Sequence, residues 1–130
     1  MVVDTSAIFA LLTGEPDADR MAEAMEPDPV RLISAANLVE LGIVVESRYG
    51  EAGGRELDLL LHRLRIETVA VTFEHAERAR VGYRRFGKGR HKAGLNFGDT
   101  FAYALSATSG EPLLFKGTDF QQTDITAVEY

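Results

Sequence analysis

The sequence predicts an α/β domain in which helices connect the strands of a parallel sheet. Short apolar segments rich in Val, Ile and Leu alternate along the chain with longer segments of helical periodicity, which is the pattern of strands joined by helical crossovers. The chain has 130 residues, of which 45% are hydrophobic, enough to bury one core. No internal repeat, linker or low-complexity segment divides it. We therefore expect residues 1–130 to form a single domain.

The N-terminal half should supply two strands and four helices. We expect strands at residues 1–3 and 30–33, and helices at about residues 6–13, 16–25, 35–48 and 55–64. Thr5 or Ser6 can cap the first helix, which Gly14 ends. Gly53 and Gly54 are expected to break the chain between the last two helices.

The C-terminal half should supply three more strands. The segment 66–71 is the clearest strand of the chain because of its β-branched content. A basic amphipathic helix over 73–86 follows, and then a glycine-rich polar loop over 87–94. The next helix has Asp99 in its first turn and ends before Gly110. Strands at 112–115 and 125–128, separated by a loop, complete the expected sheet.

Composition excludes several classes of protein and site. There is no cysteine, so disulfides, thiolate chemistry and cysteine-based zinc sites are excluded. The three histidines, His62, His75 and His91, show no metal-ligand spacing. No apolar run has the length of a membrane span, and the N-terminus lacks the basic region and cleavage site of a signal peptide. We therefore expect a cytoplasmic protein with no membrane partner.

The charge of the chain is distributed unevenly. The net charge is −6, which argues against a protein that coats nucleic acid. Six of the 14 basic residues nevertheless lie between Arg80 and Lys92, and such a segment can hold a polyanion locally. The candidates for contacts with such a polyanion are Arg84, Arg85, Lys88, Arg90, Lys92 and, farther along the chain, Lys116. The alternative is a solvated helix face followed by a mobile loop.

Four acidic residues are placed where a parallel sheet brings ligands together. Asp4 and Asp119 follow strands, so they belong to the carboxyl edge of the sheet, where α/β proteins bind ligands. Asp99 lies in the first turn of an apolar helix, where the helix dipole should keep it ionised. Glu40 is the only charge between Ala35 and Val45, in a helix that is apolar on nearly every side. Each acid also has an ordinary interpretation, as a helix cap, a turn residue or a solvated side chain.

Taken together, the four acids predict a metal site. Clustered carboxylates repel each other unless a counter-ion compensates them. Oxygen ligands without histidine or cysteine favour a hard cation, Mg²⁺ or Mn²⁺. Such ions position phosphate esters and activate water, and the basic segment would contact phosphates. The sequence therefore points to metal-assisted phosphodiester hydrolysis, with Thr5 or Ser6 orienting a water molecule.

Four motifs resemble those of the PIN-domain ribonucleases, and more narrowly the VapC toxins of bacterial toxin–antitoxin pairs. They are Val2–Ala7, Leu38–Leu41, Gly87–Asp99 and Leu113–Phe120, in the same order and spacing over essentially the whole chain. The resemblance implies a three-layer α/β/α sandwich around a parallel sheet of four or five strands. It also implies a Mg²⁺- or Mn²⁺-dependent endoribonuclease that cleaves tRNA or ribosomal RNA and inhibits translation. The expected partners are the RNA, a VapB-type antitoxin and a second copy of the chain in a homodimer.

The resemblance also assigns roles to residues. Asp4, Glu40 and Asp99 match the three invariant acids of the family, and Asp119 matches the more variable fourth. Thr118 stands where many relatives carry Asn, and its hydroxyl can still support a ligand through a hydrogen bond.

Two other functions remain open at this point. The first is a phosphatase or receiver-like domain in which Asp4 accepts a phosphoryl group and Lys116 holds it. The second is a catalytically inactive module of the same fold that only binds a partner. The presence of all four acids argues against the inactive module.

Overall fold

The computed structural model describes residues 1–130 and confirms the predicted α/β architecture. Its sheet consists of β1 (Val2–Val3), β2 (Leu32–Ser34), β3 (Glu67–Val69) and β4 (Leu113–Leu114). All pairings are parallel, and the strand order is β3-β2-β1-β4. The chain therefore builds the sheet outward from β1 in one direction and then returns to add β4 on the other side. The crevice beside such a reversal is where α/β folds bind ligands.

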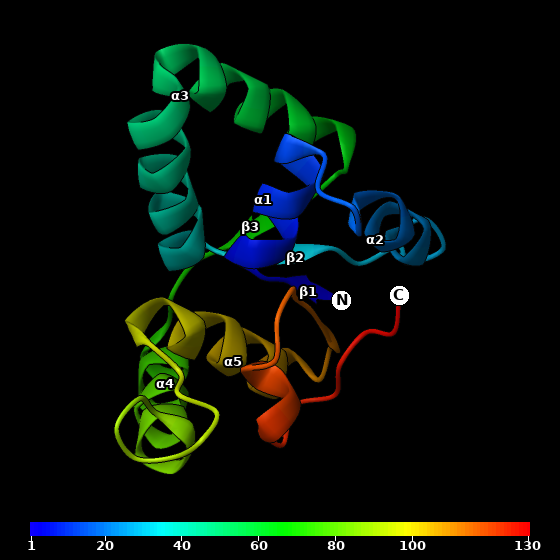
Figure 1. The fold of residues 1–130 in the computed structure, drawn as a ribbon. Coiled ribbons are helices and arrows are strands. Elements are labelled where there is room, and N and C mark those ends of the chain that lie inside the picture. Colours follow the sequence, from blue (N-terminus) through cyan, green and yellow to red (C-terminus); the bar gives the residue numbers. More distant parts are fainter.

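One helical layer covers the first face of the sheet. It contains α1 (Thr5–Thr13), α2 (Ala18–Met25) and α3 (Ala35–Arg63), which lie together on one side of the strands (Figure 1). Ile8, Met21 and Leu41 are among the fully buried side chains of the core between this layer and the sheet. The second helix begins at Ala18, two residues later than expected from Pro16, because residues 15–17 form a turn.

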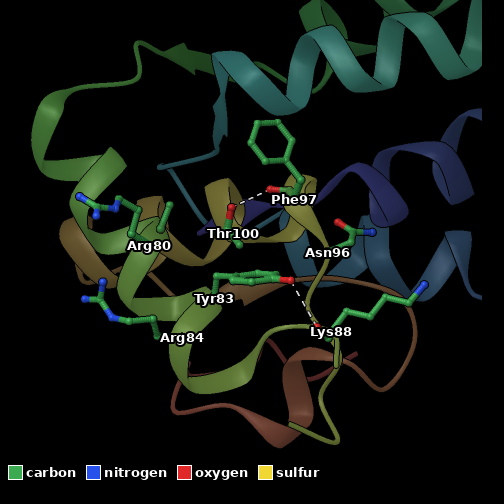
Figure 2. A pocket seen from close by; sticks show the side chains of 8 residues that line it. Arg80, Tyr83, Arg84, Lys88, Asn96, Phe97 and Thr100 are labelled. Atoms are coloured by element: carbon green, nitrogen blue, oxygen red, sulfur yellow. Dashed lines mark hydrogen bonds between the residues drawn. The ribbon is translucent and has the colours of Figure 1, made fainter. Parts of the chain in front are cut away.

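A second layer covers the opposite face with α4 (Phe73–Phe86) and α5 (Phe97–Ser109). The two helices lie side by side (Figures 1 and 2). Tyr103 and Leu95 are fully buried in the core on this side of the sheet, together with Phe86. The structure is therefore the expected three-layer sandwich. No helix combines the length and the apolar character that a membrane crossing requires.

The break in α3 occurs at Gly50 and not at the predicted Gly53–Gly54 pair. Gly50 has φ 67° and ψ −167°, a conformation that essentially only glycine adopts. Gly53 and Gly54 are helical, and a Cβ atom on Gly53 would lie 2.5 Å from the Tyr49 Cβ atom. The glycine pair therefore allows close packing just after the corner, whereas Gly50 forms the corner itself.

The expected last strand at 125–128 forms only one isolated bridge, between Leu113 and Ala127. The Leu113 amide donates to Thr126 (2.9 Å), and the Val128 amide donates to Leu113 (2.9 Å). Because β4 is only two residues long, it offers no room for a longer ladder. The sheet has four strands, and a short 3₁₀ helix over Phe120–Gln122 lies in the preceding loop.

The backbone conformation of Gly50 leads to a prediction on stability. Gly50→Ala should lower the free energy of unfolding by about 1–3 kcal/mol, because alanine is strained at this φ and ψ. The matched control is Gly42→Ala in the same helix, where a Cβ atom would meet nothing within 4 Å. It should raise the free energy of unfolding by about 0.5–1 kcal/mol through helix propensity. Denaturant unfolding of both variants measures these free energies of unfolding. If both substitutions change the free energy by the same amount in the same direction, Gly50 does not form the corner.

Candidate active site

Asp4 lies at the carboxyl end of the central strand β1 and is only 4% exposed. It is the N-cap of α1, the position that the sequence suggested for Thr5 or Ser6. Its Oδ2 atom accepts hydrogen bonds from the Ser6 amide (2.9 Å) and the Ser6 hydroxyl (2.6 Å). The Ser6 hydroxyl oxygen in turn accepts from the Lys116 amide (2.9 Å), just beyond β4. Ser6 therefore orients Asp4 and joins the ends of the two strands that flank the crevice.

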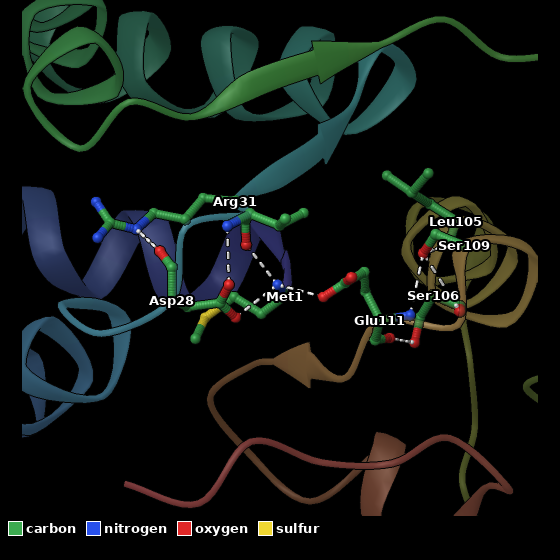
Figure 3. A network of polar contacts seen from close by, with 8 residues as sticks. Met1, Asp28, Arg31, Leu105, Ser106, Ser109 and Glu111 are labelled. Atoms are coloured by element: carbon green, nitrogen blue, oxygen red, sulfur yellow. Dashed lines mark hydrogen bonds and ion pairs between the residues drawn. The ribbon is translucent and has the colours of Figure 1, made fainter.

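The opposite end of β1 is fixed by the N-terminal ammonium group of Met1. It donates to the carboxylates of Asp28 and Glu111, each at 2.8 Å, and to the Val30 carbonyl (Figure 3). The ammonium group lowers the pKa of Asp28, although desolvation opposes the shift. Charge-assisted bonds of this kind hold the strand between β2 and the chain that leads into β4. Asp4 thus projects from a strand that is fixed at both ends.

Asp99 is positioned by the start of α5. Asn96 is the N-cap, and its side chain accepts from the Asp99 amide (2.9 Å). The Asp99 carboxylate accepts from the Asn96 amide (2.9 Å), which completes a capping box. Asp99 is therefore a helix-capping residue and a candidate ligand at once, since one carboxylate oxygen serves each purpose. The spacing Asn-x-x-Asp was a signal for Asn96 that the sequence reasoning missed.

Glu40 reaches the same place from α3. Its carboxylate lies so close to Gly98 that a Cβ atom there would be 1.7 Å from Glu40 Oε2. The buried Asn37 side chain, one turn earlier on α3, donates to the Gly98 carbonyl (2.8 Å). This bond ties α3 to the first turn of α5. Gly98 and Asn37 therefore bring Glu40 next to Asp99.

These elements enclose a pocket of about 320 Å³. It is lined by Asp4, Thr5, Ser6, Phe9, Glu15, Glu40, Val44, Asn96, Asp99 and Lys116. The structure thus brings together three of the four predicted acids and both candidate hydroxyl residues. It also adds Glu15, which the sequence reasoning missed because nothing in the turn after Gly14 marks it. Lys116 pairs with Glu15, which raises the pKa of the Lys116 ammonium group.

Two of the predicted residues lie outside the pocket lining. Asp119 is exposed and precedes the 3₁₀ helix. Its negative charge nevertheless contributes to raising the pKa of Asp99, so it acts on the same site from its rim. Thr118 is exposed beside it.

The carboxylates of the pocket are electrostatically strained. Burial raises the pKa of Asp4, although the two hydrogen bonds from Ser6 oppose the shift. Desolvation, together with the charges of Asp4, Asp119 and Glu40, raises the pKa of Asp99 to about 7. The expectation that the helix dipole keeps Asp99 fully ionised is therefore wrong for the metal-free protein. Burial and like charges outweigh the dipole.

The pocket has donors that suit a hard cation bound partly through water. No three Asp, Glu or His side chains are close enough together to ligate one ion directly. Mg²⁺ typically uses one or two carboxylates and retains several water molecules. The Thr5 hydroxyl oxygen is buried in the pocket wall and has no hydrogen-bond partner, so it can bond to such a water. Carboxylates with raised pKa values and an unpaired hydroxyl group fit a divalent ion with a partial water shell.

The basic residues divide into separate groups. Arg84 and Lys88 line a second pocket next to the first, between α4 and α5. Arg85 points elsewhere and pairs with Asp124 (2.7 Å). Arg90 and Lys92 are exposed on the loop over 87–94 and line neither pocket.

Comparison with known families and proteins gives a consistent result. Residues 1–125 match the model of the PIN domain. "Ribonuclease VapC" from Mycolicibacterium smegmatis is 59% identical over 128 residues, covering 98% of this chain and 99% of the relative. "Ribonuclease VapC30" from Mycobacterium tuberculosis is 57% identical, covering 98% of each chain.

Solved structures share the fold at low sequence identity. Mycobacterium tuberculosis VapC20, described as a sarcin–ricin loop cleaving toxin, aligns with a TM-score of 0.77 at 20% identity, covering 99% of this chain and 98% of its own. VapBC2 from Rickettsia felis, solved with a DNA fragment from its promoter, aligns with a TM-score of 0.76 at 17% identity, covering 98% and 96%.

The contact between Gly98 and Glu40 predicts an effect on metal binding. Gly98→Ala places a methyl group where the Glu40 carboxylate lies, so the carboxylate must turn away. We expect Mn²⁺ affinity, measured by titration calorimetry, to fall by about 10- to 100-fold. Gly42→Ala, at a glycine with open space around it, should leave the affinity unchanged. If Gly98→Ala binds Mn²⁺ as the parent does, Glu40 does not serve the metal.

The raised pKa of Asp99 predicts a pH-dependent change in stability. Asp99 ionises near the ordinary aspartate pKa of 3.8 in the unfolded chain and near 7 in the folded protein, so its ionisation destabilises the folded state as the pH rises between these values. In EDTA, Asp99→Asn should therefore raise the free energy of unfolding, by on the order of 2 kcal/mol above pH 7 and by little near pH 4. Thermal unfolding across this range measures it. A lower melting temperature of the variant in EDTA at high pH would contradict the repulsion between the acids.

Proposed function

We propose that this chain, which belongs to the PIN-domain family and within it to the VapC ribonucleases, is a metal-dependent endoribonuclease toxin that hydrolyses phosphodiester bonds in RNA. The observation that carries the proposal is the convergence of Asp4, Glu40 and Asp99 on one pocket at the reversal of strand order. We propose that residues 1–130 work as one PIN domain.

The acids would act as ligands. Asp4 and Asp99 each have one carboxylate oxygen engaged by a fixed backbone or side-chain donor, so the other oxygen is oriented to bind Mg²⁺ or Mn²⁺ directly. Glu40 and Asp119 would complete the shell through water, because no three such side chains lie close enough to ligate one ion together. The ion supplies an activated water and neutralises charge that develops on the phosphate. Thr5 and Ser6 would orient water and the Asp4 carboxylate, and Thr118 would support Asp119.

RNA contacts would come from the basic segment. Arg84 and Lys88 line the second pocket and would bind phosphates, with Arg90 and Lys92 adding charge from the loop over 87–94. Arg85 would contribute less, because it is paired with Asp124. Lys116 lines the acid pocket and would contact the phosphate only after release from Glu15.

The partners follow from the family. VapC20 is described as cleaving the sarcin–ricin loop, and we propose a tRNA or ribosomal RNA substrate here, with inhibition of translation in the cytoplasm as the result. The structural neighbour VapBC2 is described as bound to a DNA fragment from its promoter, and we propose a VapB-type antitoxin for this chain. We also propose a homodimer, since Val39 and Ile43 expose apolar side chains on one face of α3.

Substitution of the acids tests the proposal. Asp4→Asn, Glu40→Gln and Asp99→Asn should each lower the rate of Mg²⁺-dependent RNA cleavage by about 100-fold or more, and each should relieve growth inhibition in cells without antitoxin. Asp58→Asn, which removes an exposed carboxylate on α3 that makes no ion pair or hydrogen bond, is the matched control and should remain toxic. Mapping new RNA 5′ ends after induction would identify the cut site.

Two outcomes would contradict the proposal. If the three variants fold and remain toxic, the assigned site is wrong. If antitoxin-free wild-type protein cleaves no cellular RNA in Mg²⁺ or Mn²⁺, the chain is an inactive module that binds a partner.

A further inference from the structure

A second pocket lies beside the acid pocket, between α4 and the start of α5. Its volume is about 690 Å³, and it is lined by Ala79, Arg80, Tyr83, Arg84, Lys88, Asn96, Phe97 and Thr100. None of these residues is acidic. Asn96 also lines the acid pocket, so the two pockets meet at this residue. A chain that leaves the acid pocket at Asn96 therefore passes directly into the second one.

The charge of this pocket is not compensated within the protein. Arg84 and Lys88 form no ion pair, and neither side chain has a hydrogen-bond partner in the folded chain. Two neighbouring arginines differ in this respect: Arg80 pairs with Glu77 (2.8 Å), and Arg85 pairs with Asp124 (2.7 Å). Two unpaired cations beside a pocket, on a protein of net charge −6, are a local site for an anion.

Between the cations lies an aromatic ring in a fixed orientation. Figure 2 shows Tyr83 with Arg80 and Arg84 on one side and Lys88 on the other. The Tyr83 hydroxyl group donates to the Lys88 carbonyl (3.3 Å), which closes the ring onto the start of the loop. A Cβ atom on Gly87 would lie 2.6 Å from the Tyr83 ring, so the ring packs directly against the backbone there. Such a ring is preorganised and loses little conformational entropy when a ligand stacks on it.

We propose that this second pocket binds one unpaired nucleotide next to the scissile phosphate, with its base stacked on Tyr83. Arg84 and Lys88, which lie on opposite sides of the ring, would contact the phosphates on the two sides of that nucleotide. The inference rests on the proposed ribonuclease function and adds to it the side chain that would bind the base next to the cut. Aromatic rings bind bases that are splayed out of a helix, whereas the faces of paired bases are already covered by their neighbours. The small side chains of Ala79 and Thr100 on the adjoining helix faces leave room for the base.

Steady-state cleavage of a short mixed-sequence oligoribonucleotide tests the inference, with the same strand annealed to its complement as the second substrate. Tyr83→Leu should raise KM for the single strand about tenfold, because base–aromatic stacking is lost. Tyr83→Phe retains the ring and should change KM less than about twofold. Arg84→Gln should reduce the salt dependence of log(1/KM), its slope falling in magnitude by about 0.7 for one lost phosphate contact. The duplex should be the poorer substrate for the wild type.

The controls separate this inference from the proposed function. If the wild type cleaves RNA and both Tyr83→Leu and Arg84→Gln behave as the wild type, the nucleotide pocket is wrong and the ribonuclease stands. Equal rates of cleavage of the duplex and the single strand would also refute the nucleotide pocket and leave the ribonuclease function standing. If Tyr83→Leu leaves KM unchanged but releases a co-purified antitoxin, the pocket binds a peptide and not RNA. If the wild type cleaves no RNA, both proposals fail.

Discussion

The protein must hold mutually repelling carboxylates at one edge of a short sheet. Asp4, Glu40 and Asp99 line one pocket, and Asp119 acts on it from the rim. Desolvation, and after it the charges of the neighbouring acids, raises the pKa of Asp99 to about 7, so the ionised arrangement is unfavourable without a cation. The repulsion has to be overcome by the rest of the fold, because nothing within the acid cluster favours its formation.

The restraints on the acids act on three separate elements. Asp4 is fixed by the Ser6 hydrogen bonds on a strand whose other end is held by the Met1 ammonium group. Asp99 is locked into the capping box with Asn96. Glu40 is brought close through the Asn37 hydrogen bond to Gly98. The restraints include bonds between segments far apart in the sequence, such as that from Asn37 to Gly98, so they oppose separation of the acids. A site that resists relaxation in this way is preorganised for a charge that arrives with the ligand.

Much of this arrangement could be predicted from the sequence, since it depends on patterns that are local. The helices over 73–86 and from Phe97 to Gly110, and the placement of Asp4 after a strand, follow from periodicity, caps and β-branched residues. The positions that the sequence reasoning placed wrongly depend on tertiary contacts. Gly50 and the Gly53–Gly54 pair look alike in sequence, and only the structure shows the corner at Gly50 and Gly53 packed against Tyr49. Glu15 could not be foreseen, because its role depends on Lys116, 101 residues away.

The two neighbouring pockets have opposite electrostatic requirements, and this restricts what can occupy both. The acid pocket attracts cations and repels anions, whereas Arg84 and Lys88 attract anions. A free anion would not enter the acid pocket, and a free cation would not bind beside the arginines. A polyanionic chain accompanied by a divalent ion would suit both pockets, because the ion would offset the acid charges beside one phosphate while the basic side chains would contact the next phosphate. Asn96, which caps α5 and borders both pockets, sets the spacing between the two charges.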